Sequence, residues 1–85
     1  MRLDKFLKVS RIIKRRTLAK DVSDQGRIEI NGRVAKPASV VKEGDILEMH
    51  FGSRIIKVRI LAISLTVKKE AAAEMYEIIE EIRVL

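Results

Sequence analysis

Three segments, residues 27–30, 46–51 and 54–61, alternate apolar and polar side chains with a period of two, and this pattern limits the fold more than any other feature of the chain. In the first segment Ile28 and Ile30 alternate with Arg27 and Glu29, so each pair would lie on its own face of a β-strand. The alternation returns in residues 46–51 and 54–61, and three short turn sequences divide residues 27–61. These turns are Asn31-Gly32, Glu43-Gly44-Asp45 and Gly52-Ser53. We therefore expect a small antiparallel sheet that begins with a tight hairpin.

Two segments before the sheet have helical spacing instead. The first would span residues 3–10, and its apolar side is formed by Leu3, Phe6 and Leu7. The second would span residues 18–25, because Thr17 supplies a capping hydroxyl and Gly26 supplies a left-handed residue that ends a helix. The sequence thus predicts a helix pair directly before the first strand, with Phe6 in the core.

The C-terminal segment differs from the rest in composition. Residues 70–85 hold five glutamates and one arginine. Apolar residues recur there at helical spacing, at Ala71, Met75, Ile78, Ile79 and Ile82. We expect an acidic amphipathic helix, joined to the sheet by a linker that begins at residue 65. The sequence leaves the role of Tyr76 undetermined.

Together these elements predict an α+β fold, with two N-terminal helices packed on a small antiparallel sheet and a C-terminal amphipathic helix. A chain of 85 residues is long enough for one core. We expect residues 1–64 to form the folded domain and residues 65–85 to form the linker and helix. No apolar run reaches the roughly 18 residues that a membrane span requires, and charges interrupt the start of the chain. These features predict a cytoplasmic protein, and the small size suits a monomer.

The residue inventory argues against an enzyme. The chain has no cysteine, which excludes thiolate catalysis and cysteine-based metal sites. His50 is the single histidine and falls in an alternating segment, where a half-buried surface position is commoner than a ligand or base. No glycine-rich phosphate loop and no nucleophile elbow are present. We expect no catalytic residue, no metal and no cofactor.

Positive charge is concentrated at the start of the chain. Eight of the first twenty residues are basic and one is acidic, although the net charge of the whole chain is only +6. A polyanion sheds counterions when it meets such a field, which makes nucleic acid the expected partner. A merely solvated helix face is the alternative. The predicted contacts are Arg2, Lys5, Arg11, Lys14, Arg15, Arg16 and Lys20.

Asp4 is the one acid within this basic segment, and the sequence leaves two roles open for it. A carboxylate in the first turn of a helix complements the positive end of the helix dipole. Alternatively, Asp4 holds Arg2 in the conformation that binds the nucleic acid, and so supports the interface indirectly.

Short motifs recur in a specific order along the chain: Arg2-Leu3-Asp4-Lys5-Phe6-Leu7, Ser10-Arg11, Arg16-Thr17, Gly26-Arg27-Ile28, Ile30-Asn31-Gly32 and Gly44-Asp45-Ile46. This order resembles the RNA-binding domain named after ribosomal protein S4. The match covers residues 1–60, and its specificity comes from the spacing, since each motif alone means little. The resemblance implies that residues 1–64 form an RNA-binding domain, that the predicted basic residues contact structured RNA, and that Asp4 supports them.

Free-standing members of this family include ribosome-associated quality-control factors and heat-shock-type proteins that recycle large ribosomal subunits. The acidic end of this chain, in place of a basic tail, makes it more similar to the first group. That resemblance implies binding to ribosomal RNA of an obstructed large subunit and to peptidyl-tRNA. The protein would stabilise the tRNA while a partner factor supports template-free alanine tailing.

Three alternatives remain at this point. The protein could be the heat-shock-type recycling factor. It could be a protein-interaction adaptor that docks a partner through the apolar side of the C-terminal helix. The helix pair could also imitate a helix-turn-helix and bind DNA, although the hairpin that follows Gly26 argues against this.

Overall fold

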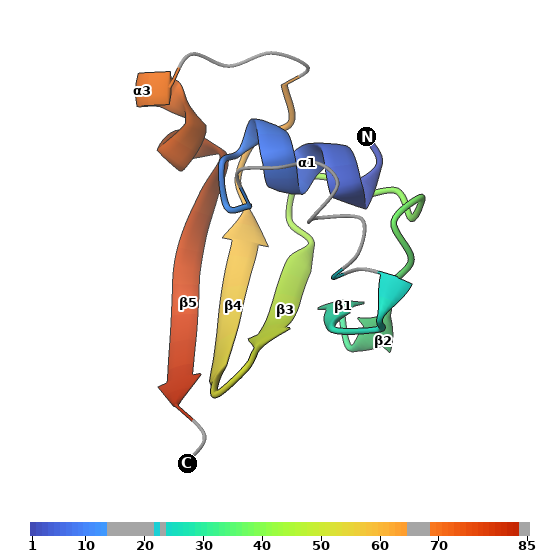
Figure 1. The fold of residues 1–85 in the computed structure, drawn as a ribbon. Coiled ribbons are helices and arrows are strands. Elements are labelled where there is room, and N and C mark those ends of the chain that lie inside the picture. Colours follow the sequence, from blue (N-terminus) through green and yellow to red (C-terminus); the bar gives the residue numbers. More distant parts are fainter. Residues whose placement is uncertain (14–21, 23, 65–68, 84–85) are drawn as a thin grey trace.

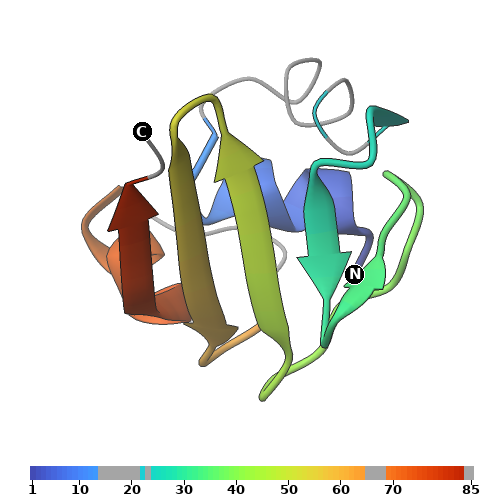
Figure 2. The ribbon, with the colours of Figure 1, turned by 90° about the horizontal axis from the view of Figure 1, so that it is seen from below.

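The alternating segments form one antiparallel sheet, as the sequence predicts. The computed structural model describes residues 1–13, 22, 24–64 and 69–83. The strands lie in the order β2-β1-β3-β4-β5, as Figures 1 and 2 show. Their bounds are β1 (Ile28–Ile30), β2 (Arg33–Val34), β3 (Ile46–Phe51), β4 (Arg54–Ile60) and β5 (Tyr76–Arg83).

Helices cover one face of this sheet. Helix α1 (Leu3–Val9) crosses the sheet, while the short helix α3 (Lys69–Ala72) and the 3-10 turn η1 (Ala73–Met75) lead into β5, as Figure 1 shows. The side chains of Leu3, Phe6 and Leu7 are completely buried. They join a core cluster with the sheet residues Ile28, Leu47, Met49, Val58 and Ile60. The prediction that Phe6 lies in the core is therefore confirmed.

The hairpin between β1 and β2 has the predicted geometry. Asn31 and Gly32 both adopt positive φ, at 51° and 84°, which matches the right-handed twist of the paired strands. Asn31 is tied to the distant Asp45, because its Nδ2 donates to Asp45 Oδ1 at 3.0 Å. Its Oδ1 accepts the backbone N–H of Ile46 at 2.9 Å. Two motifs that are separate in the sequence thus form one hydrogen-bonded unit.

Most of the predicted second helix, residues 18–25, lies outside the described residues. Val22 and Asp24 are described and are helical. The expected end signal is present: Gly26 has φ 72°, and the N–H of Arg27 donates to the carbonyl of Val22 at 3.3 Å. In the described part of the chain, no helix combines the length and apolarity that a membrane crossing would need.

The predicted C-terminal helix is wrong. Residues 76–83 form β5, which pairs antiparallel with β4 along its length. A bulge explains the error: Val58 pairs with Ile78 and Lys57 pairs with Glu80, so Ile79 is the extra residue between them. That residue breaks the two-residue alternation, and the remaining spacing imitates a helix. The adaptor interpretation loses its basis, because it required that helix.

Cross-strand contacts account for the strand conformation. Arg59 Nη1 lies 2.9 Å from Glu77 Oε1, and Arg54 Nη1 lies 3.2 Å from Glu81 Oε1. Opposite charges on adjacent strands stabilise pairing, and isoleucine favours strands over helices. The predicted linker, residues 65–69, lies outside the described residues except for Lys69, which begins α3, and β5 belongs to the same sheet as β1–β4.

Candidate nucleic-acid interface

Arg2 is held at the N-terminal end of α1. It occupies the N-cap position with extended backbone, at φ −69° and ψ 146°, and forms an isolated antiparallel bridge with Val40. Its side chain is 49% exposed. The backbone of the loop that leads to β3 therefore fixes where the Arg2 side chain leaves the surface.

Asp4 binds the Arg2 guanidinium with both carboxylate oxygens. Arg2 Nε donates to Oδ1 and Arg2 Nη2 donates to Oδ2, each at 3.2 Å. The Asp4 side chain is only 3% exposed, and its Oδ1 also accepts the backbone N–H of Lys5 at 2.8 Å. The geometry contains the contact that each of the two roles requires, and support of RNA binding by Asp4 stays a prediction. The carboxylate stabilises the first turn of α1, and it also fixes the plane of the guanidinium.

The backbone amides at the start of α1 are already used. The N–H of Leu3 donates to Ser39 O at 2.7 Å, and the N–H of Asp4 donates to Pro37 O at 3.2 Å. Together with the bond from Lys5 to Asp4, these contacts satisfy the amides that the first turn leaves free. An anion at this end of α1 would therefore be bound by side chains.

The predicted contacts that fall on described residues lie towards the two ends of α1. Lys5 is half-buried in the first turn, next to Arg2, whereas Arg11 is exposed just after the helix. A seven-residue helix separates these two positions by about 10 Å. Such a spacing suits an extended polyanion better than a single phosphate. The other predicted contacts, Lys14, Arg15, Arg16 and Lys20, lie outside the described residues.

Arg11 has an unusual backbone conformation for its residue type. Its φ is 63°, in the left-handed region that glycine or asparagine normally occupies after a helix. Its N–H donates to the carbonyl of Lys8 at 3.0 Å. A side chain other than glycine costs about 1 kcal/mol in this conformation. The arginine is therefore present despite its backbone cost.

One further basic residue, which the sequence did not indicate, belongs to the turn that contacts the start of α1. Lys36 is exposed and begins a turn in which its N–H donates to Ser39 Oγ at 2.9 Å. The same turn supplies the carbonyls that bind the first amides of α1. Lys36 therefore adds positive charge at the Arg2 end of α1. No local pattern signals this, because the contact joins residues more than thirty positions apart.

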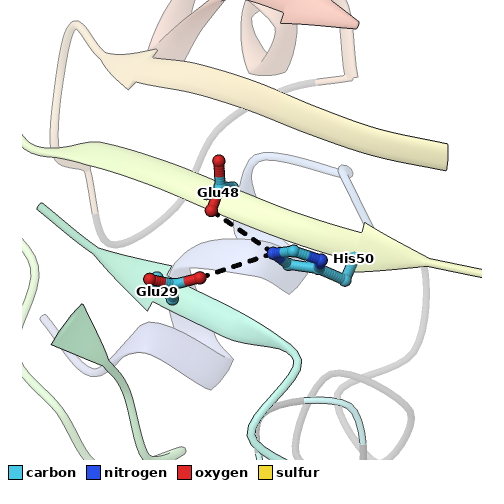
Figure 3. Close-up of side chains that lie close together, drawn as sticks. All are labelled: Glu29, Glu48 and His50. Atoms are coloured by element: carbon cyan, nitrogen blue, oxygen red, sulfur yellow. Dashed lines mark hydrogen bonds and ion pairs between the residues drawn. The ribbon is translucent and has the colours of Figure 1, made fainter. Parts of the chain in front are cut away.

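The opposite face of the sheet carries a separate group of charged side chains. His50 Nε2 lies 3.4 Å from Glu29 Oε2 and 3.3 Å from Glu48 Oε2, as Figure 3 shows. Lys57 Nζ lies 3.5 Å from Glu48 Oε1 and 3.8 Å from Glu80 Oε2. These contacts form a ladder of polar side chains across the strands, in which basic and acidic residues alternate. His50 is half-buried, as the sequence predicts.

Glu48 lies at the centre of this ladder. Its partial burial would raise its pKa, but hydrogen bonds with Glu29 and His50 and the positive charge of Lys57 outweigh that effect, so the pKa of Glu48 is lowered. Glu29, Glu48 and His50 are the side chains of the described residues whose possible metal-ligand atoms gather within 4.8 Å of one another. Because His50 and Lys57 already contact the two carboxylates, we interpret the group as a structural ladder.

Comparison with known proteins agrees with this architecture. The model of the S4 domain matches residues 1–47, which include the Arg2–Asp4 pair and the joined Asn31 and Asp45 turns. The chain therefore belongs to the S4 domain family, as the order of its motifs predicts.

Among its relatives, the RQC P-site tRNA stabilizing factor of Halalkalibacterium halodurans is 59% identical over 81 residues, which cover 95% of this chain and 92% of that protein. The factor of the same name from Bacillus subtilis is 60% identical over 81 residues and is covered to 94%. The trimeric structure of Vibrio cholerae heat shock protein 15 is also similar, with a TM-score of 0.83 and 30% identity over 92% of this chain and 80% of that one.

Proposed function

We propose that this protein is an RNA-binding factor of ribosome-associated quality control. It binds ribosomal RNA of an obstructed large subunit together with peptidyl-tRNA, and it stabilises the tRNA in the P site during template-free alanine tailing. The observation that carries this proposal is the Arg2 side chain, half exposed and held by two bonds to buried Asp4, in a chain similar over nearly its whole length to P-site tRNA stabilizing factors.

The proposed mechanism is positioning without covalent chemistry. Arg2 and Lys5 contact phosphates at one end of α1, and Arg11 contacts phosphates at the other. Lys14, Arg15, Arg16 and Lys20 extend this surface, and Asp4 keeps Arg2 in its binding orientation. Contacts of this kind fix the register of an RNA helix without reading its bases, since A-form RNA is recognised chiefly through its shape and backbone. A tRNA held in this way would stay aligned between successive additions.

The proposal also covers the oligomeric state of the protein, its location and its partner. The protein acts as a monomer in the cytoplasm and has no catalytic role of its own. A separate tail-synthesis partner on the same subunit supplies the alanyl-tRNA. This protein binds RNA and the partner supplies alanyl-tRNA, because the basic surface offers only charge and hydrogen bonds to phosphates.

Sedimentation of tagged protein with ribosomal particles tests this function. We expect the protein to travel with large subunits that carry peptidyl-tRNA, and Arg2→Ala to reduce that fraction. Arg59→Ala is a matched control, because Arg59 is 48% exposed and also paired with a glutamate, but it lies on the opposite face of the sheet. Binding to empty large subunits in preference to those with peptidyl-tRNA would favour the heat-shock-type recycling role instead. Absence from both would refute the proposal.

A further inference from the structure

An apolar pocket remains open on the helix-covered face of the sheet. It has a volume of about 470 Å³, within the range of small-molecule binding sites. Sheet residues Met49, Ile56 and Val58 line it, together with Ile12 and Ile13 from the segment after α1. We call this cavity the sheet pocket.

Two of the three aromatic residues of the chain line the sheet pocket. They are Phe51 from β3 and Tyr76 from the start of β5, and both are half-buried. The third aromatic residue, Phe6, belongs to α1, and its side chain is completely buried. Flat apolar ligands stack on partly exposed aromatic rings. The aromatic residues that remain accessible are thus gathered in one place.

Arginines contribute to the same lining. Arg11 and Arg54 line the pocket and are both exposed to solvent. Arg54 donates to Glu81 through Nη1, an exposed pair of the kind that exchanges readily with other anions. Arg11 is retained in a backbone conformation that favours glycine. An apolar interior with cations at its rim suits a ligand that is flat and apolar in part and anionic in part.

A nucleotide has this combination of properties. We propose that the sheet pocket receives one unpaired base of the bound RNA, while Arg11 and Arg54 contact the phosphates that flank it. This inference rests on the proposed RNA-binding function and adds a site on the side of α1 away from Arg2. Bases that are splayed out of a helix are commonly recognised by stacking on aromatic and arginine side chains.

Methyl NMR of the full chain tests the proposal directly. Ile56 and Ile78 line the pocket, so their δ1 methyl groups would sense the ring current of a bound base. The probes are hexa-adenylate and an abasic oligomer with the same number of phosphates. We expect hexa-adenylate to shift both methyl signals and to bind about tenfold more tightly than the abasic oligomer. Equal shifts from both probes, or no shift from either, would overturn the proposal.

A filled pocket gives a second test. Ile78 is 59% exposed, so Ile78→Phe should occupy the pocket without disturbing the core. The control is Ile82→Phe, because Ile82 lies on the same strand, pairs with Ile55 and does not line the pocket. We expect Ile78→Phe to weaken hexa-adenylate binding about tenfold and the control to have no effect, with thermal melting confirming that both variants fold.

The outcomes separate this proposal from the proposed function. If Ile78→Phe leaves hexa-adenylate binding and large-subunit sedimentation unchanged, the pocket proposal fails and the function stands. If Ile78→Phe keeps RNA binding but loses association with a protein partner, the pocket receives a protein side chain and the base proposal is wrong. If the unmodified protein binds neither RNA nor large subunits, the proposed function fails as well.

Discussion

The substitution Asp4→Asn tests whether Asp4 supports RNA binding by orienting Arg2 or only opposes it through its negative charge. An asparagine at residue 4 is nearly the same size and can still accept the N–H of Lys5, but it no longer pairs with the Arg2 guanidinium as an anion. Removing a negative charge beside an RNA site would, by Coulomb's law alone, tighten RNA binding. If Asp4 instead orients Arg2, the substitution weakens RNA binding. The two mechanisms therefore predict opposite signs.

The size of the effect follows from the burial of the two partners. Asp4 is 3% exposed and makes charge-assisted hydrogen bonds, which are worth about 1.5–3 kcal/mol in such positions. Arg2 is 49% exposed, and solvent screening limits an exposed ion pair to about 1 kcal/mol. We expect Asp4→Asn to lower the free energy of unfolding by about 2 kcal/mol. About 1 kcal/mol of this loss should come from the interaction between Asp4 and Arg2. That coupling corresponds to about fivefold weaker RNA binding.

Urea denaturation of a double-mutant cycle measures the coupling. The cycle compares Arg2→Ala, Asp4→Asn and the double variant, and filter binding of each to large-subunit RNA measures affinity. Glu77→Gln is the charge-matched control, because Glu77 lies on β5 and pairs with Arg59, on the face of the sheet opposite α1. If folded Asp4→Asn binds RNA as tightly as the unmodified protein or more tightly, the positioning argument is refuted.

Three further predictions concern stability. Met75→Ala truncates a side chain that is 2% exposed, so it should lower the free energy of unfolding by about 2–4 kcal/mol and lower the melting temperature. An unchanged melting temperature would show that Met75, just before β5, does not stabilise the core. Asn31→Ala removes two bonds and places alanine at positive φ, so its urea midpoint should fall by the equivalent of about 2 kcal/mol. Because the pKa of folded Glu48 is lowered, the stability lost in Glu48→Gln should be largest at neutral pH and shrink below about pH 4; a constant difference across pH titrations would contradict this.

The strands whose ends are marked by turn-forming residues were predictable from the sequence. Asn31-Gly32 and Gly52-Ser53 mark chain reversals through local backbone preference, and the alternation between them needs no tertiary information. Helix α1 was predictable for the same reason, since Leu3, Phe6 and Leu7 share one side of a helix and are all buried.

Strand β5 was not predictable in this way. The extra residue Ile79 shifts the alternation, and only the pairing with β4 shows that a bulge has absorbed it. The contact between Asn31 and Asp45 joins residues fourteen positions apart, and the turn that begins at Lys36 meets α1 only after folding. Tertiary contacts decide these features, and a single sequence records them weakly.

The contact between Arg2 and Asp4 was only partly predictable from the sequence. The two residues are close in sequence, and so their contact was one of two expected roles for Asp4. The structure adds the two-bond geometry and the contrast in burial, which a helical wheel does not contain.

The salt dependence of RNA binding tests the central claim most directly. If Arg2 neutralises a phosphate, the slope of log affinity against log salt for large-subunit RNA should fall by about one unit in Arg2→Ala. The slope of Arg59→Ala, whose side chain is equally exposed on the other face, should stay unchanged. Identical slopes for the unmodified protein and both variants would show that the RNA does not meet the Arg2 end of α1.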